Sequence, residues 1–140
     1  MSSRRQLLAS VLRALPAALL PARRGQAAVL MRYPYLQNVG RSRATLVWTT
    51  LDDGSGAVRY STDRSFGRAR TAVLREMPET ETELSYPYFR HKVEITDLQQ
   101  DTRYYYRVFH ENDNLLPGDE LSFRTAGPGS FRFLAFGDSG

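Results

Sequence analysis

Hydrophobic and polar residues alternate with a period of two through much of residues 29–125. Alternation of this kind predicts β-strands with one buried face, and no stretch there has the convincing period of 3.6 that indicates an amphipathic helix. The clearest run spans residues 43–50, where every second side chain is apolar: Ala44, Leu46 and Trp48. We expect Trp48, the only tryptophan, to anchor the core and its indole N–H to need one hydrogen-bond partner.

Six further segments predict strands, and residues typical of turns lie between several of them. They are residues 29–39, 57–61, 70–75, 91–97, 104–109 and 119–125, of which 70–75 is the weakest. Pro34 restricts the first strand to a sheet edge or a bulge, because proline has no N–H to donate to a neighbouring strand. Seven short strands in about 100 residues predict an all-β, two-sheet sandwich.

Two groups of polar residues invite a metal-site interpretation, and neither has the spacing for one. Residues 76–85 contain four glutamates around a proline, and we expect an exposed, mobile acidic loop there. His91 opens a predicted strand and His110 ends another. No second ligand stands two or four residues from either histidine, so we expect both to be structural or exposed.

The basic charge of the chain belongs to its first 27 residues. The formal net charge is +4, but residues 1–27 hold five arginines and no acidic side chain. Without them, 14 of the 19 basic side chains remain against 15 acidic ones, so nucleic-acid binding is not implied. The chain also has no cysteine, which excludes disulfides, thiolate metal sites and cysteine nucleophiles within it.

Residues 1–27 have the parts of an export signal: a basic start, a largely apolar stretch and small residues at a plausible cleavage point. The apolar stretch is interrupted by Arg13 and Pro16 and is too short to span a bilayer, so we expect no transmembrane span. Residues 3–8, SRRQLL, resemble the bacterial twin-arginine signal. The resemblance implies an exported protein, periplasmic or extracellular, that crosses the membrane already folded.

The most informative part of the middle region is residues 98–108, LQQDTRYYYRV. It resembles the Leu-x-Pro-x-Thr-x-Tyr-x-Tyr signature of fibronectin type III domains, with Leu98, Thr102 and Tyr104 at the signature positions. On that interpretation the Tyr104 hydroxyl forms a tyrosine corner, bonding to the backbone a few residues upstream. Gln100 stands where the signature has proline, which makes the turn less rigid.

The last fifteen residues combine a linker with a different kind of strand. Residues 126–130 are rich in glycine and proline, and residues 131–136, FRFLAF, read as a strand buried inside a parallel sheet. Residues 137–140, GDSG, follow directly, which leaves Asp138 at the carboxyl end of that strand. Ligands bind at this end of the strands in open α/β sheets.

In their order and spacing, five segments resemble the start of a bacterial purple acid phosphatase-like protein. They are RYPYLQNV at 32–39, ATLVWTT at 44–50, the tyrosine-corner segment, FRTA at 123–126 and FLAFGDSG at 133–140. The resemblance covers essentially residues 30–140. It implies an N-terminal fibronectin type III-like domain over residues 28–125, a linker over 126–130 and the first strand of an α/β metallophosphoesterase domain over 131–140.

In that family the catalytic domain holds a dinuclear metal centre, iron with zinc, manganese or a second iron. The resemblance makes Asp138 its first metal ligand, with Gly137 keeping the backbone slim beside the metal and Ser139 and Gly140 in support. Such metals bind phosphoryl oxygens and acidify a bound water for attack on a phosphate monoester. The family's other ligands lie downstream, in the catalytic domain that we expect as this region's partner. The 140 residues alone should therefore be inactive.

Two alternatives remain open from the sequence. Residues 137–139 also resemble the Gly-Asp-Ser block of GDSL-type esterases, in which Ser139 would be the nucleophile. The upstream sandwich, and Gly140 where that family usually has leucine, count against this alternative. The chain could instead be a secreted fibronectin-like binding module, because such sandwiches have many functions. A free-standing module would expose the three phenylalanines of residues 131–136 to water without benefit.

Overall fold

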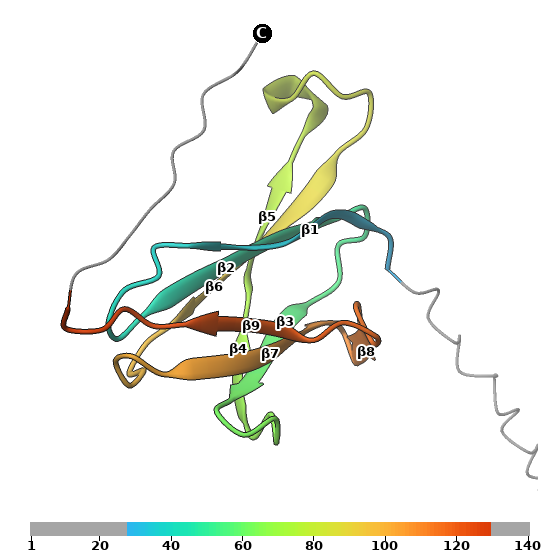
Figure 1. Cartoon of the computed structure of the whole chain (residues 1–140). Helices are drawn as coiled ribbons and strands as arrows, with labels where there is room; N and C mark the ends of the chain where they lie inside the picture. The colour runs from blue at the N-terminus through green and yellow to red at the C-terminus, as the bar shows by residue number, and fades with distance from the viewer. Residues whose placement is uncertain (1–27, 130–140) are drawn as a thin grey trace, which may run out of the picture.

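Nine strands and one short 3-10 helix form residues 28–129, the part of the chain that the computed structural model describes (Figure 1). The elements are β1 Leu30–Gln37, β2 Ala44–Thr50, β3 Gly56–Ser61, β4 Arg68–Thr71, β5 Val73–Met77, η1 Glu79–Glu81, β6 Tyr88–Ile95, β7 Arg103–His110, β8 Asp113–Asn114 and β9 Leu121–Arg124. All strand pairs are antiparallel.

The strands form two sheets that face each other. One sheet has the order β1-β2-β6-β5, and the other runs β4-β3-β7, with both β8 and β9 paired to β7. If the strands are lettered in the usual way, this is the A-B-E-D and C-F-G arrangement of immunoglobulin-type sandwiches, with one extra strand beside C. The two-sheet sandwich predicted from the alternating pattern is confirmed.

The core lies between the sheets and is supplied by the alternating positions of their central strands. Trp48 of β2 and Tyr60 of β3 are fully buried, together with most of their alternating neighbours. The core residues are Ala44, Leu46, Trp48, Val58, Tyr60, Val93, Ile95, Leu98, Tyr104, Tyr106, Val108 and Phe123. Trp48 is the predicted anchor, but its indole Nε1 is buried and finds no hydrogen-bond partner within residues 28–129.

Strand β1 shows why proline is tolerated at residue 34. It pairs only with β2, so it is an edge strand, and its register shifts between Arg32 and Tyr35. Pro34 lies within that irregularity, where a missing N–H interrupts no regular ladder. The expectation of an edge or a bulge is met by both features at once.

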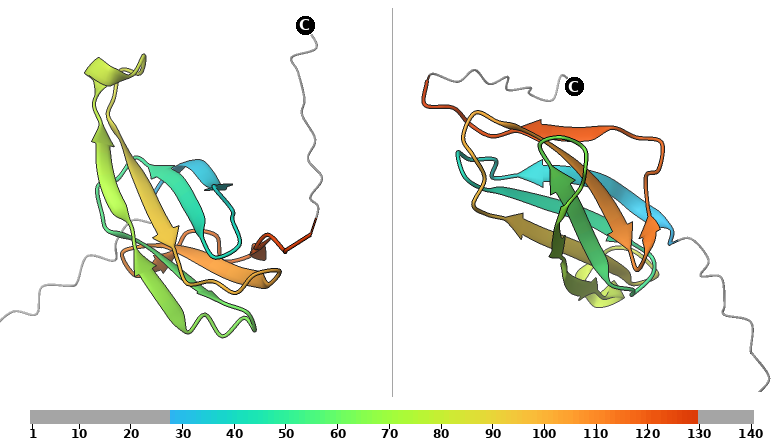
Figure 2. Two further views of the ribbon diagram at one scale, coloured as in Figure 1. Left: turned by 90° about the vertical axis from the view of Figure 1, so that its left-hand side faces the viewer. Right: turned by 90° about the horizontal axis from the view of Figure 1, so that it is seen from below.

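The segment 70–75, predicted as one strand, belongs to two strands. The chain changes sheets there: β4 ends at Thr71 in one sheet, and β5 begins at Val73 in the other. Ala72 makes the crossing, and its N–H donates to the carbonyl of Gly56 at 2.8 Å. The left-hand view of Figure 2 shows this continuous passage along the side of the sandwich. Alternation cannot locate such a step, because both halves of the segment are extended.

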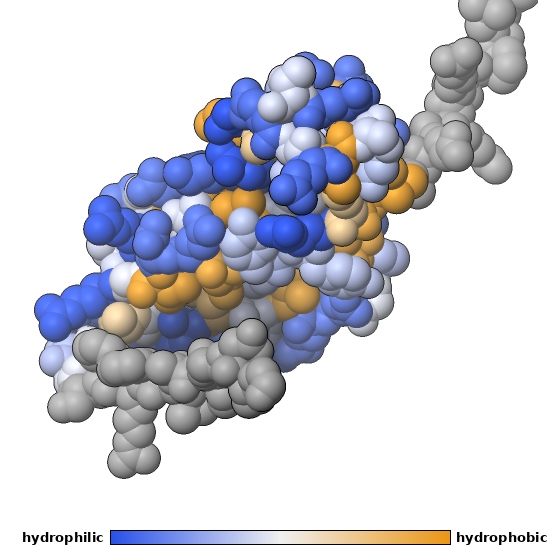
Figure 3. Space-filling view, turned by 90° about the horizontal axis from the view of Figure 1, so that it is seen from above, coloured by the Kyte–Doolittle hydropathy of each residue, from blue (hydrophilic) through white to orange (hydrophobic). Residues whose placement is uncertain are grey.

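The acidic segment extends beyond the sheets after β5. Glu79 and Glu81 lie in η1, and Glu81 pairs with Arg75 at 2.6 Å between exposed side chains. Figure 3 looks onto this end and shows hydrophilic residues interrupted by patches of hydrophobic ones. Exposed large apolar side chains in the described residues include Val29, Met31, Tyr33, Val73, Leu74 and Tyr86.

The predicted position of His91 at the start of a strand is wrong, whereas the expectation that it is structural is met. His91 lies inside β6 and not at its start, and it is fully buried. Its ring stacks on Trp48 with centroids 5.0 Å apart, and its Nε2 lies 2.8 Å from the Thr50 hydroxyl. His110 ends β7 as predicted. Its ring meets the His91 ring edge to face, with centroids 5.9 Å apart. Both histidines are therefore part of the core, a position that their polar character conceals in the sequence.

Candidate functional site

The end of the sandwich where the chain leaves β9 is fastened by a tyrosine corner. Tyr104 is buried in β7, and its hydroxyl accepts a hydrogen bond from the Gln99 N–H at 2.9 Å. This is the bond that the tyrosine-corner interpretation expects. The Tyr104 ring also stacks on Phe123 of β9, with centroids 5.7 Å apart. One side chain thus connects the β6–β7 loop to the last strand before the linker.

Thr125 ties the end of β9 to the same loop. Its side chain is buried, and its hydroxyl donates to the Gln99 carbonyl at 2.6 Å while accepting from the Thr102 N–H at 2.9 Å. Its own N–H donates to the Thr102 carbonyl at 3.0 Å. A buried side chain with this many partners fixes the backbone direction at residue 125.

The first residue of the predicted linker is held on both sides. The Ala126 N–H donates to the Gly40 carbonyl at 2.9 Å, and its carbonyl accepts from the Asp101 N–H at 3.2 Å. Arg124 adds an exposed ion pair to Asp101 at 3.0 Å, which contributes little by itself. The chain therefore leaves the sandwich in a defined direction as far as residue 126. We call residues 99–102 together with residues 124–126 the linker clamp.

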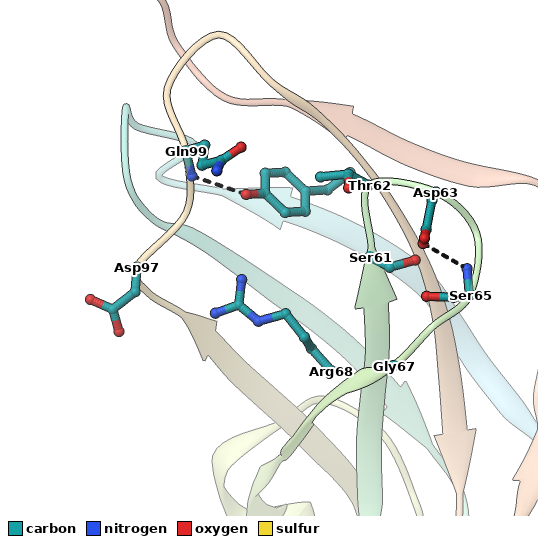
Figure 4. Close-up of a pocket in the computed structure, with 9 residues that line it drawn as sticks. Ser61, Thr62, Asp63, Ser65, Gly67, Arg68, Asp97 and Gln99 are labelled. Atoms are coloured by element: carbon teal, nitrogen blue, oxygen red, sulfur yellow. Dashed lines mark hydrogen bonds between the residues drawn. The ribbon is translucent and has the colours of Figure 1, made fainter.

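The loop that carries the clamp also borders a polar hollow of about 360 Å³ (Figure 4). The β3–β4 turn forms its other wall. Arg68 projects into the space between the two walls, and Asp97 stands at the opposite rim. The remaining lining residues are Ser61, Thr62, Asp63, Ser65, Gly67, Gln99 and Tyr104.

The polar groups of this hollow serve mostly to shape the turn. The Asp63 carboxylate accepts from the Ser65 N–H at 3.0 Å, and hydrogen bonds from Ser65 hold the pKa of Asp63 below its ordinary value. The Ser61 hydroxyl accepts from the Phe66 N–H at 2.9 Å.

Of the residues singled out from the sequence, one group lies in the sandwich and the other lies outside the described residues. Leu98 is buried beside the corner, and the Thr102 hydroxyl donates to the Gln100 carbonyl at 2.8 Å, within the turn that lacks the usual proline. Gly137, Asp138, Ser139 and Gly140 lie outside the described residues. Within residues 28–129 no three His, Cys, Asp or Glu side chains gather as a metal site. The described residues thus offer no donor set for a dinuclear centre.

Sequence reasoning missed Thr125 and Asp101 as parts of the clamp. A threonine at the end of a strand carries no distinctive signal, and its role depends on a loop more than twenty residues earlier in the chain. Asp101 has a positive φ of 53° and Asp97 one of 58°, a conformation that aspartate tolerates better than most residues. The sequence indicates a role for Asp97 and Asp101 only through their position in a loop rich in polar residues.

The family of this chain is shown by its match to a protein-family model. The model described as "Purple acid Phosphatase, N-terminal domain" matches residues 33–125, which is well over half of the chain. The chain belongs to this family. The match to the purple acid phosphatase N-terminal domain ends at Thr125, within the linker clamp. No curated protein sequence matches the chain.

Solved structures with a similar shape are distant in sequence. A fibronectin type III domain from the human KIAA0970 protein has 13% identity and a TM-score of 0.48, over 81% of this chain and 86% of its own. The sensor domain of the anti-sigma factor RsgI4 from Pseudobacteroides cellulosolvens has 12% identity and a TM-score of 0.47, over 78% and 99%. In residues 28–129, no helix has the length and apolar character needed to cross a bilayer.

Proposed function

We propose that this chain is the N-terminal region of an exported, metal-dependent phosphoesterase of the purple acid phosphatase type that hydrolyses phosphate monoesters. The observation that carries the proposal is the family match over residues 33–125, which is followed in the sequence by an apolar segment and GDSG at 137–140. Export is supported by the twin-arginine-like residues 3–8.

The sandwich contributes position and not chemistry in this proposal. In this proposal the dinuclear centre of iron with zinc, manganese or iron belongs to a following catalytic domain, to which the family resemblance assigns the other ligands. Asp138 is the one ligand that this chain supplies. The linker clamp holds the backbone as far as residue 126, which precedes Asp138 by twelve residues in the sequence.

The test compares the 140-residue chain with the protein encoded by the longer reading frame. We expect the longer protein to hydrolyse p-nitrophenyl phosphate and the 140-residue chain to show no turnover and no tight stoichiometric binding of iron or zinc. Turnover by the 140-residue chain would show that the chemistry is misplaced.

Two substitutions in the longer protein separate the phosphatase from the esterase. Asp138→Asn should abolish phosphatase activity, because the metal centre loses a charged ligand, whereas Ser139→Ala should retain most of it. An esterase with Ser139 as nucleophile would give the opposite result for Ser139→Ala, with loss of p-nitrophenyl acetate hydrolysis.

A further inference from the structure

The outer face of the β4-β3-β7-β9 sheet is basic. Residues on β3, β7 and β9 that alternate with the core positions point outward, and they include four arginines and no carboxylate. These are Arg59, Arg103, Arg107 and Arg124, all of them exposed. In the right-hand view of Figure 2 this sheet lies in front of the other one. We call these four residues the arginine face.

The arginines are placed opposite one another. Arg59 of β3 is the direct cross-strand partner of Arg107 in β7, and Arg103 of β7 is the partner of Arg124 in β9. Like charges directly opposite one another on antiparallel strands destabilise a sheet. A bound anion would relieve the repulsion between such pairs, above all between Arg59 and Arg107, for which no ion pair is found within residues 28–129.

Two of the guanidinium groups lie over aromatic rings. Arg59 lies over the Phe109 ring at 4.7 Å, and Arg107 lies over the Phe66 ring at 4.2 Å. Among residues 28–129 neither has a carboxylate within ion-pair distance, whereas Arg124 pairs with Asp101. A guanidinium stacked on a ring keeps its N–H edges available, and its planar fork binds carboxylates in a bidentate manner.

A hollow of about 250 Å³ lies beside Arg107, between the β3–β4 turn and residues 117–121. Its wall includes Arg64, which stacks on Tyr105 at 4.0 Å and pairs with Glu120 at 2.7 Å. Asp119 and Glu120 also line it, so this hollow carries both signs of charge. The carboxylates of Asp119 and Glu120 at the edge of the hollow can accept hydrogen bonds from the hydroxyl groups of a ligand. They would repel a ligand whose negative charges are closely spaced.

We propose that the arginine face binds an acidic polysaccharide, a polymer whose spaced carboxylates meet Arg59 and Arg107 and whose hydroxyls meet the acidic edge of the hollow. This function is independent of the proposed phosphatase activity. Nucleic acid fits less well, since the Phe66 and Phe109 rings are already covered by guanidinium groups and offer less surface for base stacking. An anionic membrane fits less well, because the face has no protruding apolar side chains to insert.

The test measures the affinity of the 140-residue chain for fluorescent oligogalacturonate at low salt. The variant carries Arg59→Gln and Arg107→Gln. The matched control carries Arg41→Gln and Arg70→Gln, which remove the same charge from exposed positions outside the face, and both keep the basic residues 1–27. We expect the face variant to bind at least about tenfold more weakly, as two lost charge-assisted contacts imply, and the control to lose less than about threefold.

Three outcomes overturn the proposal. Equal losses in the two variants would show that binding follows net charge alone. Wild-type binding no tighter than to neutral dextran would show that the face has no such ligand. Tighter, face-dependent binding to single-stranded DNA or to vesicles of anionic phospholipid would assign the face to another class of partner. Circular dichroism and thermal melting verify that both variants remain folded.

Discussion

At the scale of single residues, Tyr104 is the side chain on which the linker end of the sandwich most depends. Its hydroxyl reaches the Gln99 N–H at 2.9 Å, and its ring packs on Phe123. Leu98, one residue before Gln99, is buried and donates its N–H to the Ser42 carbonyl at 3.0 Å. The corner thus holds a polar loop against the core although Gln100 stands at the usual proline position.

Replacing Tyr104 by phenylalanine tests this role. Tyr104→Phe keeps the ring and leaves the Gln99 N–H without its partner, so the free energy of unfolding should fall by about 1–2 kcal/mol. Urea unfolding followed by circular dichroism measures the change. Tyr105→Phe is the matched control, because Tyr105 points to the outer face and its change should stay within about 0.5 kcal/mol. Equal changes in the free energy of unfolding for the two substitutions would show that the tyrosine corner does not stabilise the fold.

At the scale of elements, the backbone at the start of β3 packs directly against side chains of the other sheet. A Cβ atom added at Gly56 would lie 2.5 Å from the His91 Nδ1 atom and 2.7 Å from the Trp48 Cζ2 atom. Glycine is required there because the Trp48 and His91 rings from β2 and β6 fill the space above the β3 backbone. In the sequence, Gly56 is interpreted as a residue of the turn at 52–56. Only the packing shows that Gly56 is needed because it has no side chain.

We expect Gly56→Ala to lower the free energy of unfolding by about 1–3 kcal/mol, because the added methyl group forces the rigid rings or the backbone to move. Chemical denaturation gives the value. Gly118→Ala provides the comparison, because its added methyl group meets no atom within 4 Å, and it should leave stability within about 0.5 kcal/mol. A Gly56→Ala protein as stable as the Gly118→Ala protein would mean that the sheets separate more easily than the contacts indicate.

At the scale of the whole molecule, the burial of His91 makes the fold sensitive to acid. Burial lowers the pKa of His91 from its ordinary value of 6.5 to about 4, with a smaller contribution from the nearby His110. Above pH 6.5 the His91 ring is neutral in both the folded and the unfolded protein. Between pH 6.5 and 4 the unfolded chain takes up a proton that the folded chain does not, so stability falls as the pH falls.

This contribution amounts to roughly 3 kcal/mol between pH 6.5 and 4. Urea unfolding at a series of pH values should show it, and a His91→Gln protein should have a flatter profile although it is less stable at neutral pH. An NMR titration of the wild-type protein checks the same point without a substitution. A His91 ring that titrates near pH 6.5 would contradict the expectation.

The sequence by itself determined the two-sheet sandwich, the core face of β2 and the tyrosine corner. Each depends on local signals, namely alternation, turn residues and a fixed spacing between Leu98, Thr102 and Tyr104. The change of sheets at Ala72, the burial of His91 and the linker clamp around Thr125 were decided only by the tertiary structure. They depend on which strands come together, and the contacts that bury a histidine or fasten a threonine come from residues far away in the sequence.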